Sequence, residues 1–105
     1  MSEEKREMGK VFEYGSIVTT AAVHDIYTAD RRFARFVAMS LGRHLSGDWG
    51  DLDKEDKALN EEALKSGGRL HSAYKIPESF KTEDKLWIIT EADRSVTTIL
   101  FPSDY

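Results

Sequence analysis

KLWIITEADRSVTTILF, residues 85–101, holds the two clearest strand patterns in this chain. The runs KLWIIT and SVTTILF are rich in β-branched and aromatic residues, which favour extended structure. The polar EADR between them has the length of a short hairpin connection. Because both alternate positions of these runs are apolar, we expect the sheet to be covered on both faces or to take part in an oligomer.

Weaker patterns nearer the N-terminus add further strands and helices. Short strands are expected at about 16–20 and in RLHSAYKI, residues 69–76. A helix over about 30–45 repeats apolar residues three and four positions apart, and a second helix is expected over about 53–65, with Leu59 in its thin apolar stripe. Together these elements predict an α+β fold: a single small domain with a three- to four-stranded antiparallel sheet and helices packed on one face.

The ends of the two helices have recognisable capping residues. Thr28 or Asp30 can cap the first helix, and Asp53 followed by Asp56 resembles a capping pair at the start of the second. Gly67 and the glycine after it suit the end of the second helix.

Length and composition limit the class of protein. The 105 residues fit one domain, expected at 13–105, preceded by a flexible or helical arm at 1–12. The chain has no cysteine, which excludes disulfides, cysteine-based zinc sites and a thiol nucleophile, and suits a reducing cytosol. MSEEKREMGK lacks the apolar core of a signal peptide, and no apolar run approaches the ~20 residues of a membrane span. We therefore expect a cytoplasmic protein without membrane contact.

The charge distribution is the most informative feature. From Asp48 to Glu62 the chain carries seven acidic residues and two lysines, a net charge of −5, whereas the whole chain has −4. The preceding helix, residues 30–45, has four arginines and one acid. An acidic surface suits a basic protein partner, although the same pattern also describes a solvated helix with a favourable dipole. The net negative charge argues against direct nucleic-acid binding.

Two segments supply the candidate partner-binding residues. These are Asp48, Trp49, Asp51, Asp53, Glu55, Asp56, Glu61, Glu62, Asp93 and Arg94. Trp49, between two glycines, is either a lid over the core or an exposed anchor for a partner. In the hairpin tip, Glu91 or Asp93 could act as an acid or base with Arg94 as an anion clamp; alternatively, Asp93 bonds its own backbone and Arg94 pairs with a nearby acid.

Metal and cofactor sites are not expected. A calcium loop starting at Asp51 would need glycine at its sixth position, where the chain has Asp56. The three histidines, His24, His44 and His71, lack the spacing of a ligand set, and each is expected to be neutral and partly buried.

Four blocks of the chain resemble a known family. They are GSIVTT, RHLSGDWGDLDKEDKALNEEAL, GGRLHSAY and LWIITEADRSVTTILFPSDY, within residues 15–105. In these blocks the chain resembles small uncharacterised bacterial proteins associated with plasmids and phages, for which no enzymatic activity is established. The resemblance implies an origin in a mobile genetic element and places the acidic stretch and the hairpin tip within the family pattern, but it carries over no catalytic residue.

The leading hypothesis combines this context with the charge. It is a non-enzymatic inhibitor of a host defence nuclease complex, an anti-CRISPR or anti-restriction protein, whose carboxylates replace phosphates in a basic nucleic-acid-binding groove. One alternative is a small hydrolase or nuclease that uses Asp48, Glu91, Asp93 and Arg94, with or without a divalent cation. Another is a structural or regulatory partner of a plasmid protein, with a homodimer built on the late strands as one form.

Overall fold

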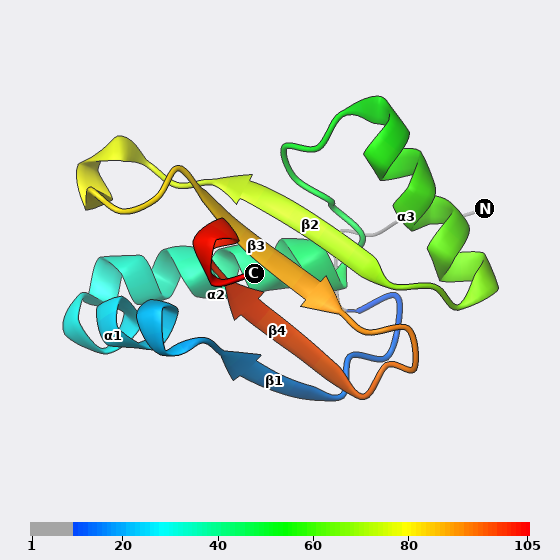
Figure 1. Cartoon of the computed structure of the whole chain (residues 1–105), viewed down its shortest axis with the longest axis horizontal. Coiled ribbons are helices and arrows are strands. Elements are labelled where there is room, and N and C mark those ends of the chain that lie inside the picture. The colour runs from blue at the N-terminus through cyan, green and yellow to red at the C-terminus, as the bar shows by residue number, and fades with distance from the viewer. Residues whose placement is uncertain (1–9) are drawn as a thin grey trace.

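The computed structural model describes residues 10–105, which form one four-stranded sheet with helices packed against it (Figure 1). The elements are β1 (Ser16–Thr19), α1 (Ala21–Ala29), α2 (Arg31–Leu45), α3 (Lys54–Ser66), β2 (Leu70–Lys75), β3 (Lys85–Thr90) and β4 (Val96–Leu100), with short 3₁₀ turns η2 (Glu78–Phe80) and η3 (Pro102–Asp104). The predicted α+β class is confirmed. Of the arm expected at residues 1–12, residues 1–9 lie outside the described part of the chain.

The sheet is mixed, although the sequence predicted an antiparallel one. Its strand order is β1-β4-β3-β2, and β3 pairs antiparallel with both neighbours, so the predicted hairpin forms its centre. β1 instead runs parallel to β4, with Ser16 beside Val96. A tight hairpin dictates an antiparallel pair, but β1 and β4 are connected through all the other elements, so no local turn sets their relative direction. β1 and β2 are therefore the two edge strands.

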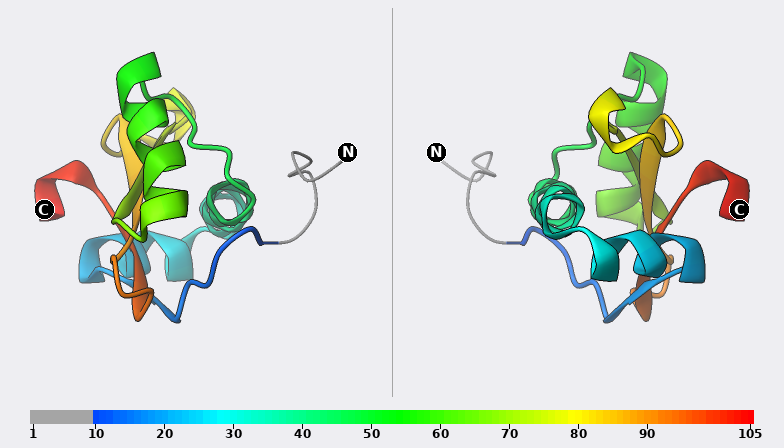
Figure 2. Two further views of the ribbon diagram at one scale, coloured as in Figure 1. Left: turned by 90° about the vertical axis from the view of Figure 1, so that its right-hand side faces the viewer. Right: turned by 90° about the vertical axis from the view of Figure 1, so that its left-hand side faces the viewer.

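The helices α1 and α2 build the core on one face of the sheet. Leu86 and Ile88 of β3 and Ile99 of β4 pack there with Phe33 and Val37 of α2. Figure 2 shows the sheet edge-on, with α2 on one side and the C-terminal turn η3 on the other. The helix α3 lies beyond β2, at the side of the sheet (Figure 1).

The alternate residues of β3 and β4 point to the other face. Ile89 and Leu100 are buried there and Trp87 is half-buried. Burial on both faces accounts for the apolar residues at both alternate positions of the hairpin, which is the first of the two explanations that the sequence allowed.

Local capping fixes the helix ends, as the sequence predicted. The Asp30 carboxylate accepts hydrogen bonds from the backbone of Arg32 and Phe33 at the start of α2. The Asp53 carboxylate accepts from the Asp56 backbone at 2.8 Å at the start of α3. Gly67 ends α3 in the left-handed conformation, with a φ of 87°.

A buried chain of polar side chains joins α2 to the sheet. The His44 ring lies 2.5 Å from the Ser72 hydroxyl through Nδ1 and 2.9 Å from the Thr90 hydroxyl through Nε2. Thr90 in turn contacts the Thr97 hydroxyl at 2.7 Å. Burial lowers the pKa of His44 to about 3, so the ring is neutral, as predicted. The prediction that every histidine is partly buried is wrong for His24, whose side chain is exposed.

Within residues 10–105, no helix is long and apolar enough to cross a membrane.

Candidate functional site

The acidic stretch begins as a cover for the outer edge of β2. Asp51 donates its backbone N–H to the carbonyl of Ala73 at 2.7 Å, and its carboxylate accepts from the backbone of Lys75 at 2.7 Å. The carbonyl of Trp49 accepts from the Ala73 N–H at 3.4 Å. We call residues 49–51, together with Asn60 of α3, the edge cover. They supply backbone partners that an edge strand otherwise lacks.

Asn60 completes the edge cover through its side-chain amide. Its Nδ2 donates to the carbonyl of His71 at 2.8 Å, and its Oδ1 accepts from the His71 N–H at 3.1 Å. The amide thus takes the place of a neighbouring peptide group. Sequence reasoning placed Leu59 in the buried stripe of this helix, but Asn60 is buried and Leu59 is 67% exposed. The bonds to β2 require a polar residue at the buried position.

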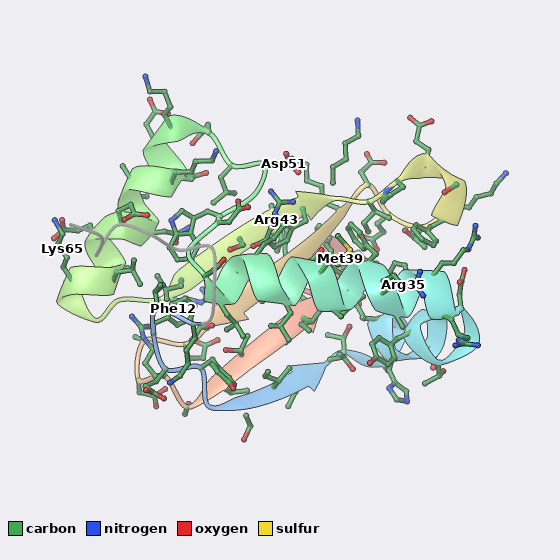
Figure 3. The ribbon with its side chains drawn as sticks, turned by 180° about the vertical axis from the view of Figure 1, so that it is seen from behind. Phe12, Arg35, Met39, Arg43, Asp51 and Lys65 are labelled. Carbon is green, nitrogen blue, oxygen red and sulfur yellow. The ribbon has the colours of Figure 1, made fainter. Side chains whose placement is uncertain are left out.

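Asp48 is neutralised by the arginine helix. Arg43 of α2 donates to its carboxylate through Nε at 2.8 Å and Nη2 at 3.2 Å. The hydrogen bond from Arg43 holds the pKa of Asp48 below its usual value. Figure 3 shows Arg43 on the side of α2 that approaches the loop carrying Asp51. Asp48 therefore contributes little to an unpaired negative field.

Trp49 is a lid over the core. It is 4% exposed and packs its ring near Phe12 and His44, with ring centroids 6.2 and 5.8 Å away. Its Nε1 donates to the carboxylate of Glu61 at 2.8 Å. Of the two alternatives for Trp49, burial agrees with the lid and leaves almost no surface for a partner.

The charges of α3 separate onto two faces. Glu55 and Glu62 lie four and three residues from Leu59 and share its face. The lysines of the helix, Lys54, Lys57 and Lys65, fall on another side, which also carries Glu61. We call Glu55, Asp56 and Glu62 the acidic face of α3. Within residues 10–105, no lysine or arginine lies at ion-pair distance from these three carboxylates.

A groove of about 430 Å³ adjoins the acidic face, on the side of the sheet away from α2. Its lining residues are Leu52, Asp56, Leu59, Asn60, Arg69, His71, Ala73, Lys85, Trp87 and Pro102. The Trp87 ring stands edge-on to His71, with centroids 4.5 Å apart. Burial lowers the pKa of His71, and its Nε2 is a buried atom that has no hydrogen-bond partner within residues 10–105. The groove is thus an apolar hollow with charged side chains around it.

The hairpin tip is a turn whose polar groups are used internally. The Asp93 carboxylate accepts from the backbone N–H and the hydroxyl of Ser95, at 3.0 and 2.6 Å. Arg94 donates to the carbonyls of Gly68 at 2.6 Å and Ala63 at 3.3 Å, so it binds the end of α3. Asp93 behaves as in the turn interpretation, whereas Arg94 binds carbonyls and not the expected acid.

The residues of the hydrolase alternative have separate local partners. In the described part of the chain, no hydrogen bond or ion pair joins Asp48 to the hairpin tip, and Glu91 lies 3.7 Å from Arg69. Nor do three or more histidine, aspartate or glutamate side chains among residues 10–105 converge as a metal site would require.

Four of the ten predicted residues have local structural roles that the sequence did not assign to them: Asp48, Asp51, Glu61 and Arg94. Trp49 forms the lid that the sequence offered as one of two alternatives. Asp53 caps α3 as predicted, and the acidic face keeps three of the others together. Sequence reasoning missed the groove beside them, for which the exposed position of Leu59 on a mostly polar helix was the available signal. No family model, curated protein or solved structure matches the chain. The site must therefore be interpreted from its own geometry.

Proposed function

We propose that this chain is a non-enzymatic interaction protein that binds a basic protein surface through the acidic face of α3 and the adjoining groove. The observation that supports this is the position of Leu59, 67% exposed, between carboxylates that have no ion-pair partner within residues 10–105. Protein interfaces commonly combine an apolar centre with a polar rim. An apolar partner side chain would enter the groove while basic groups meet Glu55, Asp56 and Glu62.

Charge separation along the molecule supports the same proposal. The described residues extend 41 Å along the longest axis and 25 and 24 Å along the others. Arg35 lies toward one end of the long axis, and α3 lies at the other end (Figure 3). The exposed arginines at the start of α2 are therefore too far away to neutralise the acidic face. Because α3 also carries three lysines on another side, the attraction for a basic partner is local to the acidic face of α3.

The specific form that we propose is inhibition of a host defence nuclease complex, in keeping with the family resemblance. Glu55 and Glu62 lie seven residues apart, or about 10.5 Å along the helix axis, which is about three times the roughly 3.4 Å axial rise per phosphate of a nucleic-acid strand. Leu59 adds an apolar contact that nucleic-acid phosphates lack. The inhibitor would therefore discriminate between a nuclease groove and other basic surfaces.

The test is inhibition of DNA cleavage by restriction and CRISPR effector complexes of the host. The double variant Glu55→Lys/Glu62→Lys should weaken inhibition at least about tenfold, or about 1.4 kcal/mol of binding free energy. The matched control Asp25→Lys/Glu78→Lys makes the same change of charge at exposed positions outside α3 and should inhibit like the wild type.

Two results would contradict the proposal in different ways. Equal inhibition by both double variants would mean that net charge, and not the acidic face, is responsible. If no effector is inhibited, the nuclease form is wrong. Salt-sensitive binding to another basic protein, lost in Glu55→Lys/Glu62→Lys, would then support the interaction function alone.

A further inference from the structure

β1 is the second edge of the sheet, and no other segment within residues 10–105 pairs with its outer side. Ser16 and Thr20 donate their backbone N–H groups to Ser95 and Ile99, both at 3.1 Å, so the even-numbered residues face β4. Successive residues of a strand direct their backbone groups to opposite sides, which leaves Ile17 and Thr19 facing outward. Among the described residues, no loop or side chain bonds to these outward groups.

The side chains of this edge do not discourage pairing. Residues 15–20 contain no charged residue and no proline, which are the usual means of blocking an exposed edge. Ile17 and Val18 are 41% and 42% exposed, although both are large and apolar. In Figure 1, β1 runs along the margin of the sheet with no other segment on its outer side.

We propose that β1 pairs antiparallel with β1 of a second copy of this chain, joining two four-stranded sheets into one. In the register that uses both outward residues, Ile17 lies opposite Thr19 of the partner subunit and exchanges two hydrogen bonds with it. The twofold axis generates a second pair of the same kind, in which Thr19 lies opposite Ile17 of the partner subunit. The axis itself passes between Val18 and Val18 of the partner subunit. In an antiparallel ladder such a pair without hydrogen bonds brings its side chains closest together.

A second copy fits this edge better than an unrelated strand does. A twofold interface requires a surface that is complementary to itself, and the sequence Ile17-Val18-Thr19 pairs with its own reversed copy, with the two Val18 side chains in mutual contact. The late strands cannot serve in this way, because β3 and β4 are internal and β2 has its edge cover. The dimer leaves both α3 helices exposed, at opposite margins of the joined sheet, and it does not depend on what α3 binds.

The interface is small, so association is expected to be weak. A four-residue strand offers an interface of the small class, below roughly 1,200 Å², in which weak and transient contacts are found. We expect a dissociation constant between about 1 μM and about 1 mM, or about 8 to 4 kcal/mol of binding free energy. Sedimentation velocity of the full chain over that concentration range should show a monomer that converts to a dimer.

Charged variants at Val18 test the position of the axis. Val18→Lys and Val18→Glu should each remain monomeric at every concentration, because like charges then face each other across the axis. An equimolar mixture of the two should again form dimers, since Lys now faces Glu. Met39→Lys, at an exposed position on α2, is the control and should dimerise like the wild type.

Amide hydrogen exchange gives a second measurement that needs no substitution. The amides of Ile17 and Thr19 should become more protected as the protein concentration rises, because they then donate to the partner. A wild type that stays monomeric, a dimer that survives both Val18 substitutions, or a mixture no more dimeric than its components would each overturn the proposal. So would unchanged exchange at Ile17 and Thr19.

Discussion

The two edges of the sheet are treated in opposite ways by the same chain. The β2 edge is bonded by residues 49–51 and by the amide of Asn60, whereas the outward groups of Ile17 and Thr19 on β1 have no such partner within residues 10–105. The difference shows that part of the acidic stretch serves the fold. Asp51 is acidic in the charge count, yet its carboxylate holds a backbone N–H of β2.

The comparison also shows that an acidic residue in the sequence is not always a carboxylate that a partner can bind. Asp48 is paired with Arg43, and Glu61 receives the Trp49 N–H, so a large share of the apparent field is committed inside the molecule. The carboxylates that remain on the acidic face of α3 are those that sequence spacing alone placed beside Leu59. Four changes, described in order of decreasing effect, test how far the two edges differ.

Gly50→Ala should have the largest effect, because it disrupts the edge cover. Gly50 has a φ of +77°, and an added Cβ would lie 2.1 Å from the carbonyl oxygen of Ala73. Backbone strain and the clash together should destabilise the protein by about 3 kcal/mol or more, measured by urea unfolding. Gly42→Ala is the matched control: among the described residues no neighbour outside the helix lies within 4 Å of the added atom, and alanine in a helix should stabilise by up to about 1 kcal/mol. Wild-type stability in Gly50→Ala would show that the cover is dispensable.

Asn60→Ala should cost about 2–4 kcal/mol, because the carbonyl and N–H of His71 both lose their partner. Urea unfolding measures the loss, and hydrogen exchange should become faster at the His71 amide. Glu62→Ala, at an exposed position of the same helix, should stay within about 0.5 kcal/mol of the wild type. If the two variants are equally stable, the inference that the Asn60 amide takes the place of a neighbouring peptide group is wrong.

The buried His44 ring contacts Ser72 of β2 and Thr90 of β3, and it should make the stability of the protein depend on pH. The pKa of His44 is about 3 in the folded protein, against the usual 6.5 of a histidine in water, so the unfolded state binds more protons below pH 6.5. Stability is therefore complete above that pH and is lost as the pH falls, by about 1.4 kcal/mol per unit.

Unfolding by urea between pH 7 and about pH 5 measures this slope. His44→Gln should be less stable at pH 7 but should show a shallower slope. His24→Gln, the same change at an exposed histidine, is the control for stability and should lie within about 0.5 kcal/mol of the wild type at pH 7. A slope that is unchanged in His44→Gln would assign the pH dependence to other groups.

Val18→Thr should have the smallest effect, because β1 is an open edge. Both residues are β-branched and the side chain is 42% exposed, so the stability of the dilute monomer should change by no more than about 0.5 kcal/mol. Thermal unfolding at low concentration measures it. A loss as large as that of Asn60→Ala would show that the edge of β1 is packed against something in the monomer.

The sequence by itself determined the elements whose signals are local. The hairpin of β3 and β4, the caps at Asp30 and Asp53, and the glycine at the end of α3 depend on residues a few positions apart, so their patterns could be interpreted directly. The α+β class follows from the same short-range periodicity.

Only the tertiary structure decided the rest. Asn60 is buried in place of Leu59 because its amide bonds β2. β1 pairs parallel with β4, and Trp49 donates to Glu61, although no local turn sets either contact. Hydrogen-bond partners of that kind are set by which edges and faces the folded chain brings together, and a charge count along the sequence contains no information about them. For that reason the sequence located the acids, and the fold divided them between bonding β2 and facing solvent.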